Sequence, residues 1–136
     1  MEDLLIGTWK LNPAESQFDA HHRPRAATMV LERTPEGHYL LTAEGLNEKG
    51  EPVKERPTRM IADGKEHPVP DLPGLIAVVT RSDPYTLTAE VHREDGSVVG
   101  GGTYAVSKDG KSLTATNFGY DTQLRQFKQQ TAWVRD

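Results

Sequence analysis

The stretch Tyr85–His92, Tyr-Thr-Leu-Thr-Ala-Glu-Val-His, alternates apolar and polar side chains without a break. Tyrosine, leucine, alanine and valine fall at every second position, and threonine, glutamate and histidine fill the positions between them. Because successive side chains of a β-strand point to opposite faces, this pattern predicts a strand with one buried and one solvent-facing side. The same period of two returns in residues 27–32, 112–119 and 127–134. Leu75–Val79 is apolar on both faces and predicts a strand that is covered on both sides.

Turn-forming residues separate these segments at regular intervals. Glycine supplies a positive φ, proline presets φ and aspartate bonds to its own backbone, so clusters of the three mark tight turns. Such clusters stand at 35–37, 48–50, 63–64, 83–84, 94–96 and 108–110. Strands of about 7 to 10 residues joined by hairpins fit this spacing, and long helices do not. The one candidate helical turn is 13–18, with Asn12 as its N-cap and Pro13 at its first position.

About nine or ten such strands, connected in sequence, make an antiparallel meander. An open meander exposes the unpaired backbone of its two edge strands, and closing the sheet on itself removes those edges. We therefore predict an all-β protein with a single up-and-down antiparallel β-barrel. A sandwich of two sheets is the structural alternative, since hairpin signals do not count sheets.

Length and composition set further bounds. Residues 1–136 are expected to form a single barrel domain with one core or one small cavity. The absence of cysteine excludes disulfides, thiolate nucleophiles and zinc ribbons. The net charge of −4 is spread along the chain, which leaves no basic stripe for nucleic acid. The mean hydropathy of −0.63 and the acidic start of the chain point to no membrane span and no signal peptide. We expect a cytoplasmic protein of undetermined oligomeric state.

Four short motifs occur in order along the chain. They are Gly7–Asn12 (Gly-Thr-Trp-Lys-Leu-Asn), Ser16–Phe18 (Ser-Gln-Phe), Asp63–Val69 (Asp-Gly-Lys-Glu-His-Pro-Val) and Ser107–Thr114 (Ser-Lys-Asp-Gly-Lys-Ser-Leu-Thr). A Gly-x-Trp on the first strand with a basic residue near the end of the last, here Arg135, resembles the calycin superfamily of lipocalins and their relatives. More closely, the set resembles small bacterial lipocalin-like proteins of uncharacterised function. The resemblance covers most of the chain and implies a lipocalin-like barrel more firmly than any function.

The tryptophan and the arginine of this resemblance also have a physical rationale of their own. A large indole at the start of the first strand can plug one end of a barrel. Its buried N–H then requires an acceptor, and a guanidinium over the ring adds a cation–π contact of about 0.5–2 kcal/mol. We therefore predict structural roles for Trp9 and Arg135.

Strand parity predicts the lining of the interior. If Arg135 points inward, every second residue before it on the last strand does so too, which gives a row with aromatic ends and a polar centre. The candidate ligand-binding residues are Met29, Tyr85, Leu87, Tyr104, Phe127, Gln129, Thr131 and Trp133. An unsatisfied buried Gln129 would cost about 1–3 kcal/mol, so a water or a ligand should satisfy it. The alternative is that Gln129 bonds a neighbouring strand's side chain in a filled core.

A lining of this kind suits a small, mostly apolar molecule with one or two hydrogen-bonding groups. The preferred hypothesis is therefore lipocalin-like binding of a small apolar or amphipathic molecule, without a cofactor. The alternative is a cofactor-independent isomerase, lyase or cyclase in the same cavity. Its candidate acid–base groups are Tyr104, Glu55 and Arg59, beside Tyr85 and Gln129. A third hypothesis, a passive interaction domain, predicts a filled core and an exposed apolar patch.

Three further features allow two interpretations each. The charged residues 53–62, interrupted by Pro57, indicate an edge or bulged strand whose charges stand at the cavity rim or act on a substrate. Gly100–Gly102 permits its strand to bend, or a ligand to approach its backbone. Glu90 and His92 share a strand face, as a solvated contact or as a carboxylate-oriented base. The sequence has no histidine or carboxylate spacing typical of a metal site, so no metal is expected.

Overall fold

The computed structural model describes residues 3–17, 25–54, 57–69, 72–120 and 126–136, without the side chains of residues 120 and 127. These residues form β1 (Gly7–Gln17), β2 (Ala26–Arg33), β3 (Tyr39–Leu46), β4 (Pro52–Lys54), β5 (Thr58–Met60), β6 (Glu66–Pro68), β7 (Leu75–Asp83), β8 (Thr86–Arg93), β9 (Val98–Val106), β10 (Ser112–Tyr120) and β11 (Gln126–Arg135). The predicted all-β class is confirmed. In this part of the chain there is no helix with the length and apolar character that crossing a membrane requires.

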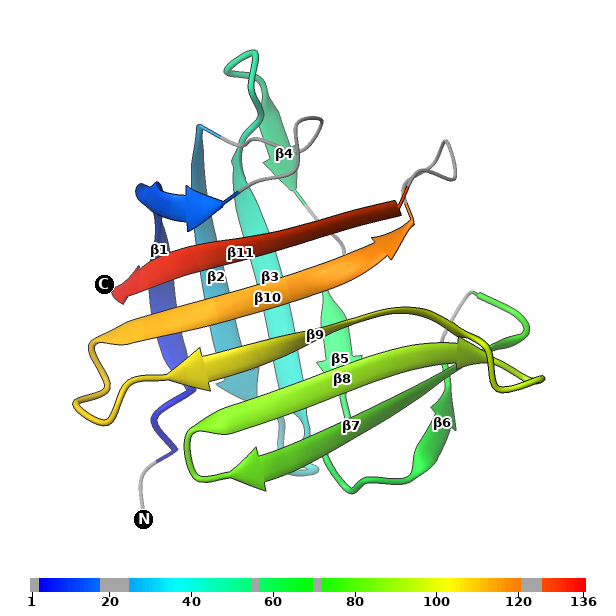
Figure 1. Cartoon of the computed structure of the whole chain (residues 1–136). Coiled ribbons are helices and arrows are strands. Elements are labelled where there is room, and N and C mark those ends of the chain that lie inside the picture. The colour runs from blue at the N-terminus through cyan, green and yellow to red at the C-terminus, as the bar shows by residue number, and fades with distance from the viewer. Residues whose placement is uncertain (1–2, 18–24, 55–56, 70–71, 121–125) are drawn as a thin grey trace.

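The eleven strands belong to one antiparallel sheet of order β4-β3-β2-β1-β11-β10-β9-β8-β7-β6, with β5 pairing to β3. On both sides of the β1–β11 pair the neighbours follow the sequence, as a meander requires. The first and last strands pair directly, with Trp9 opposite Arg135. The described strands therefore form one continuous sheet and not the sandwich of two sheets that was the structural alternative. The sheet curls, so that β1–β3 lie behind β10 and β11 and cross them at an angle (Figure 1).

The ladder leaves a seam between β3 and β7. Within the described residues, β5 pairs with β3 and β6 pairs with β7, but no ladder joins these two pairs. Residues 61–65 connect β5 to β6 across the seam. The Gly64 N–H donates to the Val79 carbonyl of β7 (2.9 Å). The β3 and β7 edges are therefore linked by the connecting residues 61–65 and by the side-chain contacts of Asp3, Tyr39 and Arg81, not by a ladder.

Alternating residues of these strands pack one half of the interior. The buried apolar residues form one cluster: Leu5, Trp9, Met29, Leu31, Tyr39, Met60, Val79, Leu87, Tyr104, Val106, Leu113, Ala115 and Trp133. On β8, Leu87 is fully buried and Glu90 is exposed, which agrees with the parity predicted for Tyr85–His92. The same holds on β11, where Trp133 is buried and Val134 is exposed.

The side chains of Trp9 and Arg135 tie the N-terminal segment to the last strand. Trp9 is fully buried, and its Nε1–H donates to the Leu5 carbonyl (3.1 Å). The Arg135 guanidinium lies 4.3 Å from the centroid of the indole ring. It also donates to the carbonyls of Gly110 (2.6 Å) and Ile6 (2.8 Å). A single arginine therefore satisfies backbone acceptors of two loops while it covers the indole.

The helical turn predicted for residues 13–18 is wrong, because residues 13–17 continue β1 and the last residue lies outside the described part. The register of β1 against β11 shifts after Asn12, so β1 carries extra residues there. The Ser16 hydroxyl donates to the Asn12 carbonyl (2.7 Å) and accepts from the Ala132 N–H (2.8 Å). A serine side chain thus stands in for a ladder bond and keeps the irregular strand attached to its partner.

The charged segment 53–62 forms two short strands instead of one. β4 and β5 stand on either side of Pro57, and each pairs with β3 through three residues. Proline donates no ladder bond, and Pro57 lies just before β5, outside both described ladders. An edge or a bulge was predicted here; residues 55–56 lie outside the described part.

Candidate functional site

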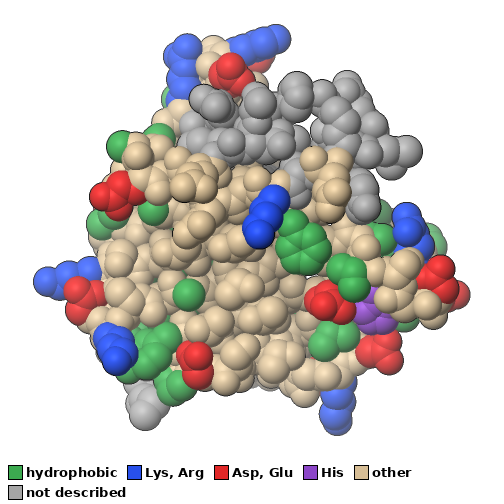
Figure 2. All heavy atoms as spheres, in the orientation of Figure 1, with side chains coloured by type: hydrophobic (Ala, Val, Ile, Leu, Met, Phe, Trp, Pro, Cys, Tyr) green, Lys and Arg blue, Asp and Glu red, His purple; other side chains and the backbone are tan. Residues whose placement is uncertain are grey.

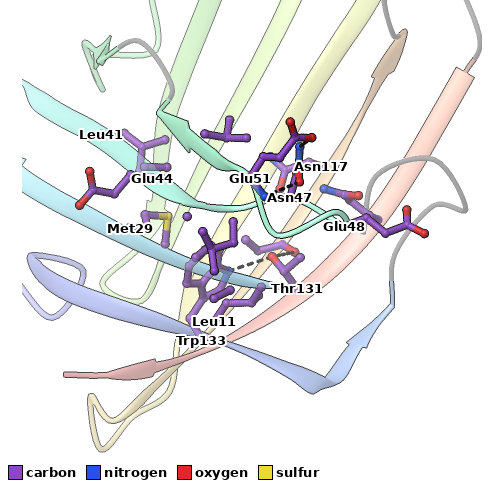
Figure 3. A pocket seen from close by; sticks show the side chains of 18 of the residues that line it. Leu11, Met29, Leu41, Glu44, Asn47, Glu48, Glu51, Asn117, Thr131 and Trp133 are labelled. Carbon is purple, nitrogen blue, oxygen red and sulfur yellow. Dashed lines mark hydrogen bonds between the residues drawn. The ribbon is translucent and has the colours of Figure 1, made fainter. Parts of the chain in front are cut away.

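The other half of the interior is hollow. A cavity of about 660 Å³ lies among β1–β4 and β9–β11, next to the packed core (Figure 3). Its described lining residues are Leu11, Ala26, Ala27, Met29, Leu41, Ala43, Glu44, Gly45, Leu46, Asn47, Glu48, Lys49, Glu51, Val53, Tyr104, Ala115, Asn117, Gln129, Thr131 and Trp133. This volume lies within the range of typical small-molecule sites in proteins.

Apolar side chains form most of the cavity wall. Leu11 of β1, Met29 of β2 and Leu41 of β3 meet the indole of Trp133 on β11 around the same space (Figure 3). Met29 and Trp133 also belong to the buried core, so the wall is continuous with the packed half. Because ladders hold these residues, the sheet rather than a loop sets this part of the cavity's shape.

Two of the polar groups in the wall already have partners within the protein. The Trp133 Nε1–H donates to the Thr131 hydroxyl oxygen (2.8 Å). That hydroxyl in turn donates to the Ala115 carbonyl (3.3 Å). Thr131 therefore satisfies the buried indole N–H, which is a structural need of its own.

Two side-chain amides lie side by side in the wall. Gln129 and Asn117 are direct partners in the β10–β11 register, so their side chains point to the same face, and both line the cavity. The Gln129 Oε1 atom is buried and has no hydrogen-bond partner. Gly102 stands opposite Asn117 on β9, and a Cβ there would lie 2.7 Å from the Asn117 Nδ2 atom. The glycine therefore makes room for the asparagine amide.

Protein groups approach the other glycines of this run as well. A Cβ at Gly101 would lie 2.5 Å from the Ala89 carbonyl oxygen and 3.1 Å from the Phe118 ring. A Cβ at Gly100 would lie 3.1 Å from the Phe118 carbonyl oxygen. The register of β8 against β9 also shifts beside Gly100. Close packing of β8 and β10 therefore accounts for the bare backbone of Gly100 and Gly101 without a ligand.

The charged lining residues stand at the entrance. They belong to the end of β3 and the β3–β4 turn: Glu44, Glu48 and Glu51 (Figure 3), together with Lys49. The Asn47 Oδ1 atom accepts from the backbone N–H groups of Lys49 (2.9 Å) and Glu51 (3.0 Å), which fixes this turn. On the face of the molecule shown in Figure 2, positively and negatively charged side chains are scattered, and neither sign forms a continuous patch. The sequence predicts only a turn at 48–50, and no pattern there signals its place at the cavity entrance.

The structure brings most of the predicted ligand-binding residues together. Those that line the cavity are Met29, Tyr104, Gln129, Thr131 and Trp133. Leu87 is fully buried in the core and Tyr85 packs against it, so both lie in the packed half instead. The side chain of Phe127 lies outside the described residues. Leu11, which strand parity from Trp9 also predicts to point inward, lines the cavity too. Leu41 and Asn117 were not predicted, although they share the faces of predicted inward residues.

The candidate acid–base residues do not converge. Tyr104 lines the cavity, whereas Glu55 lies outside the described residues. Arg59 is exposed on β5, and its neighbour Met60 is buried, so Arg59 faces away from the core. His92 pairs with Glu66 (3.4 Å), from the neighbouring part of the sheet. Among the residues that the structure describes, no group of three histidines or carboxylates could hold a metal.

A second polar cluster links the two edges of the seam. The Tyr39 hydroxyl of β3 donates to Asp3 Oδ2 and accepts from Arg81 of β7 and from Arg33 of β2 (2.9 Å). Asp3 also pairs with Arg33 (2.7 Å) and Arg81 (3.1 Å). Burial raises the pKa of Asp3, but the hydrogen bonds from Tyr39, Arg81, the Leu5 N–H and Arg33 outweigh it and lower the pKa to about 2. The Asp3 carboxylate thus joins β2, β3 and β7.

Replacing Asp3 by asparagine is expected to lower the free energy of unfolding, and to do so only where the carboxylate is ionised. The pKa of Asp3 in the folded chain is depressed from 3.8 to about 2, so the stabilisation is fully present above about pH 4 and is lost as the pH falls through 2. Urea unfolding across this range checks the prediction. Glu94→Gln, at an exposed position, is the matched charge control. A wild-type advantage that persists unchanged at pH 2 would contradict it.

Comparison with solved structures places the fold in a known class. The fluorescent protein UnaG superposes with a TM-score of 0.62 over 100% of both chains at 13% identity. A mutant of UnaG gives 0.61 over 99% of this chain and 98% of that one, at 12% identity. The structure of EF1p2_mFAP2b bound to DFHBI gives 0.53 over 98% and 94%, at 11% identity. No protein-family model and no curated protein sequence matches the chain.

These likenesses show that the chain shares its antiparallel β-fold with these proteins, in agreement with the fold that the motifs of the first and last strands implied. At such low identities they show the fold alone. A shared fold does not imply a shared activity, and the function depends on the residues of the cavity.

Proposed function

We propose that the protein binds a small, mostly apolar molecule inside the cavity between β1–β4 and β9–β11. The observation that carries this proposal is a hollow of about 660 Å³ whose inner wall is mostly apolar and whose buried Gln129 Oε1 atom has no partner. Close-packed interiors leave few voids larger than a water molecule, so a space of this size in one half of the interior supports a binding role. An occupant would fill the space and satisfy the amide.

Two further observations support binding rather than turnover. The polar groups of the inner wall are amides and hydroxyls, and of the two acid–base candidates that the structure describes, Tyr104 lines the cavity and Arg59 does not. The solved structure of one similar fold, EF1p2_mFAP2b, is bound to DFHBI, so such a fold can accommodate a compound of that kind.

Titration with N-phenyl-1-naphthylamine, a neutral dye that fluoresces in apolar surroundings, tests the proposal. We expect a saturable rise in fluorescence at one dye per chain, and displacement of the dye by small apolar metabolites. A bound ligand at 100 times its Kd should also add about 2.7 kcal/mol to the free energy of unfolding. Linear, unsaturable fluorescence together with an unchanged melting temperature across the panel would refute ligand binding.

A further inference from the structure

Three side-chain amides line the cavity, and Asn47 is engaged in the β3–β4 turn, so Gln129 and Asn117 are the amides left for a ligand. Thr131 and Trp133 already bond within the protein, and Tyr104 has a partner of its own. The Gln129 Oε1 atom is buried and unpartnered, and the amide of Asn117 lies directly across the β10–β11 ladder from it. Whatever enters the cavity must therefore make its hydrogen bonds mainly with these two side chains.

A carboxamide presents a C=O acceptor and an N–H donor next to each other. Its matching partner is a group that carries a donor and an acceptor in the same adjacent arrangement, because two parallel hydrogen bonds can then form. A cyclic amide has this arrangement in a fixed, flat geometry, with no rotatable bond to order on binding. Gly102 leaves space at the wall for the Asn117 amide itself, which holds this amide next to Gln129.

The inner wall carries no charge in the described residues, and this restricts the head group further. All charged lining residues belong to 44–51 at the entrance. Glu44 pairs in register with Lys54, and Arg25 bonds the Glu48 carbonyl, so cations accompany the acids at this rim. A carboxylate or an ammonium group beside Gln129 would lose its hydration without gaining a counter-charge.

We propose, on the basis of the proposed function, that the cavity selects a neutral ligand whose apolar ring system carries an adjacent hydrogen-bond donor and acceptor, as a cyclic amide does. The apolar body lies against Leu11, Met29 and Trp133. The donor–acceptor edge pairs with the Gln129 amide and, beside it, with Asn117. Fatty acids and amines of similar size are disfavoured by the same geometry.

Four probes of nearly equal size separate these contributions in isothermal titration calorimetry of the full chain. They are quinolin-2-one, its N-methyl derivative, naphthalene and naphthalene-2-carboxylate. We expect quinolin-2-one to bind at least about tenfold more tightly than the N-methyl compound, because methylation removes the donor to a buried acceptor. We expect naphthalene-2-carboxylate to bind most weakly of the four.

Matched variants identify the residue that reads the donor. Gln129→Leu should remove the preference for quinolin-2-one over its N-methyl derivative, and Gln130→Leu, at the exposed neighbouring position of β11, should keep it. Gln129→Leu should also leave the ligand-free melting temperature unchanged or raise it, because it removes an unsatisfied buried acceptor. A lower melting temperature would indicate that Gln129 serves the fold instead.

The outcomes distinguish this inference from the proposed function. Equal binding of all four probes, or tightest binding of the carboxylate, overturns the donor–acceptor inference and leaves ligand binding intact. Binding of none, naphthalene included, refutes the cavity as a binding site and the inference with it. A donor preference that survives in Gln129→Leu assigns the recognition to another residue and overturns the role of the amide.

Discussion

Trp9→Ala is expected to lower the free energy of unfolding by about 3–5 kcal/mol, the usual result of removing a large buried aromatic side chain. Trp9 is fully buried, bonds the Leu5 carbonyl through its N–H and is covered by the Arg135 guanidinium at 4.3 Å. Its loss empties the space between the N-terminal segment and β11 and leaves the arginine without its ring. Urea unfolding monitored by far-ultraviolet circular dichroism checks the value, because Trp133 complicates a fluorescence signal.

Two companion variants show which part of this arrangement stabilises the fold. Arg135→Met keeps the apolar stem but removes the bonds to the carbonyls of Gly110 and Ile6, so we expect a loss smaller than that of Trp9→Ala. Val134→Ala, at an exposed position of the same strand, should change stability by no more than about 0.5 kcal/mol. A Trp9→Ala effect as small as that of Val134→Ala would show that the plug is dispensable.

Much of the fold was predictable because neighbouring residues alone determine which face of a strand is buried and where the chain turns. The alternation in Tyr85–His92 reports which face of a strand is buried, and the turns at glycine and aspartate report where strands reverse. Pairing of the first strand with the last, at Trp9 and Arg135, needed the motif as well as the pattern. Parity from Arg135 then gave the lining residues of β11, since a period of two holds along a regular strand.

The errors fall where side chains replace regular backbone pairing. Asn12 and Pro13 predicted the start of a helical turn. Instead, the Ser16 hydroxyl bonds the Asn12 carbonyl and the Ala132 N–H and holds residues 13–17 in an irregular strand, which the propensities of these residues do not reveal. Asp3 lies far from Arg81 in the sequence, yet the two meet across the seam. Leu87 and Tyr104 are register partners on β8 and β9 and share one face of the sheet. Their parity does not say at which point along the strands the packed core ends and the hollow begins.

That boundary makes the second large effect testable: Ala43→Phe is expected to weaken binding of N-phenyl-1-naphthylamine at least about tenfold while the chain stays folded. Ala43 is half-buried on β3 and lines the hollow, so the added ring has free space to enter and competes with the ligand for it. In a filled core the same substitution would overpack and cost about 1–3 kcal/mol of stability.

Ala105→Phe is the matched control, because Ala105 is also half-buried in a strand but does not line the cavity. We expect it to leave dye affinity unchanged. The two measurements, affinity and melting temperature, separate the possibilities for Ala43→Phe. Lost affinity with an unchanged or raised melting temperature means that the ring occupies real empty volume where the ligand binds. Retained affinity would place the dye elsewhere, and a sharply lowered melting temperature would mean that the half of the interior described as hollow is packed in solution.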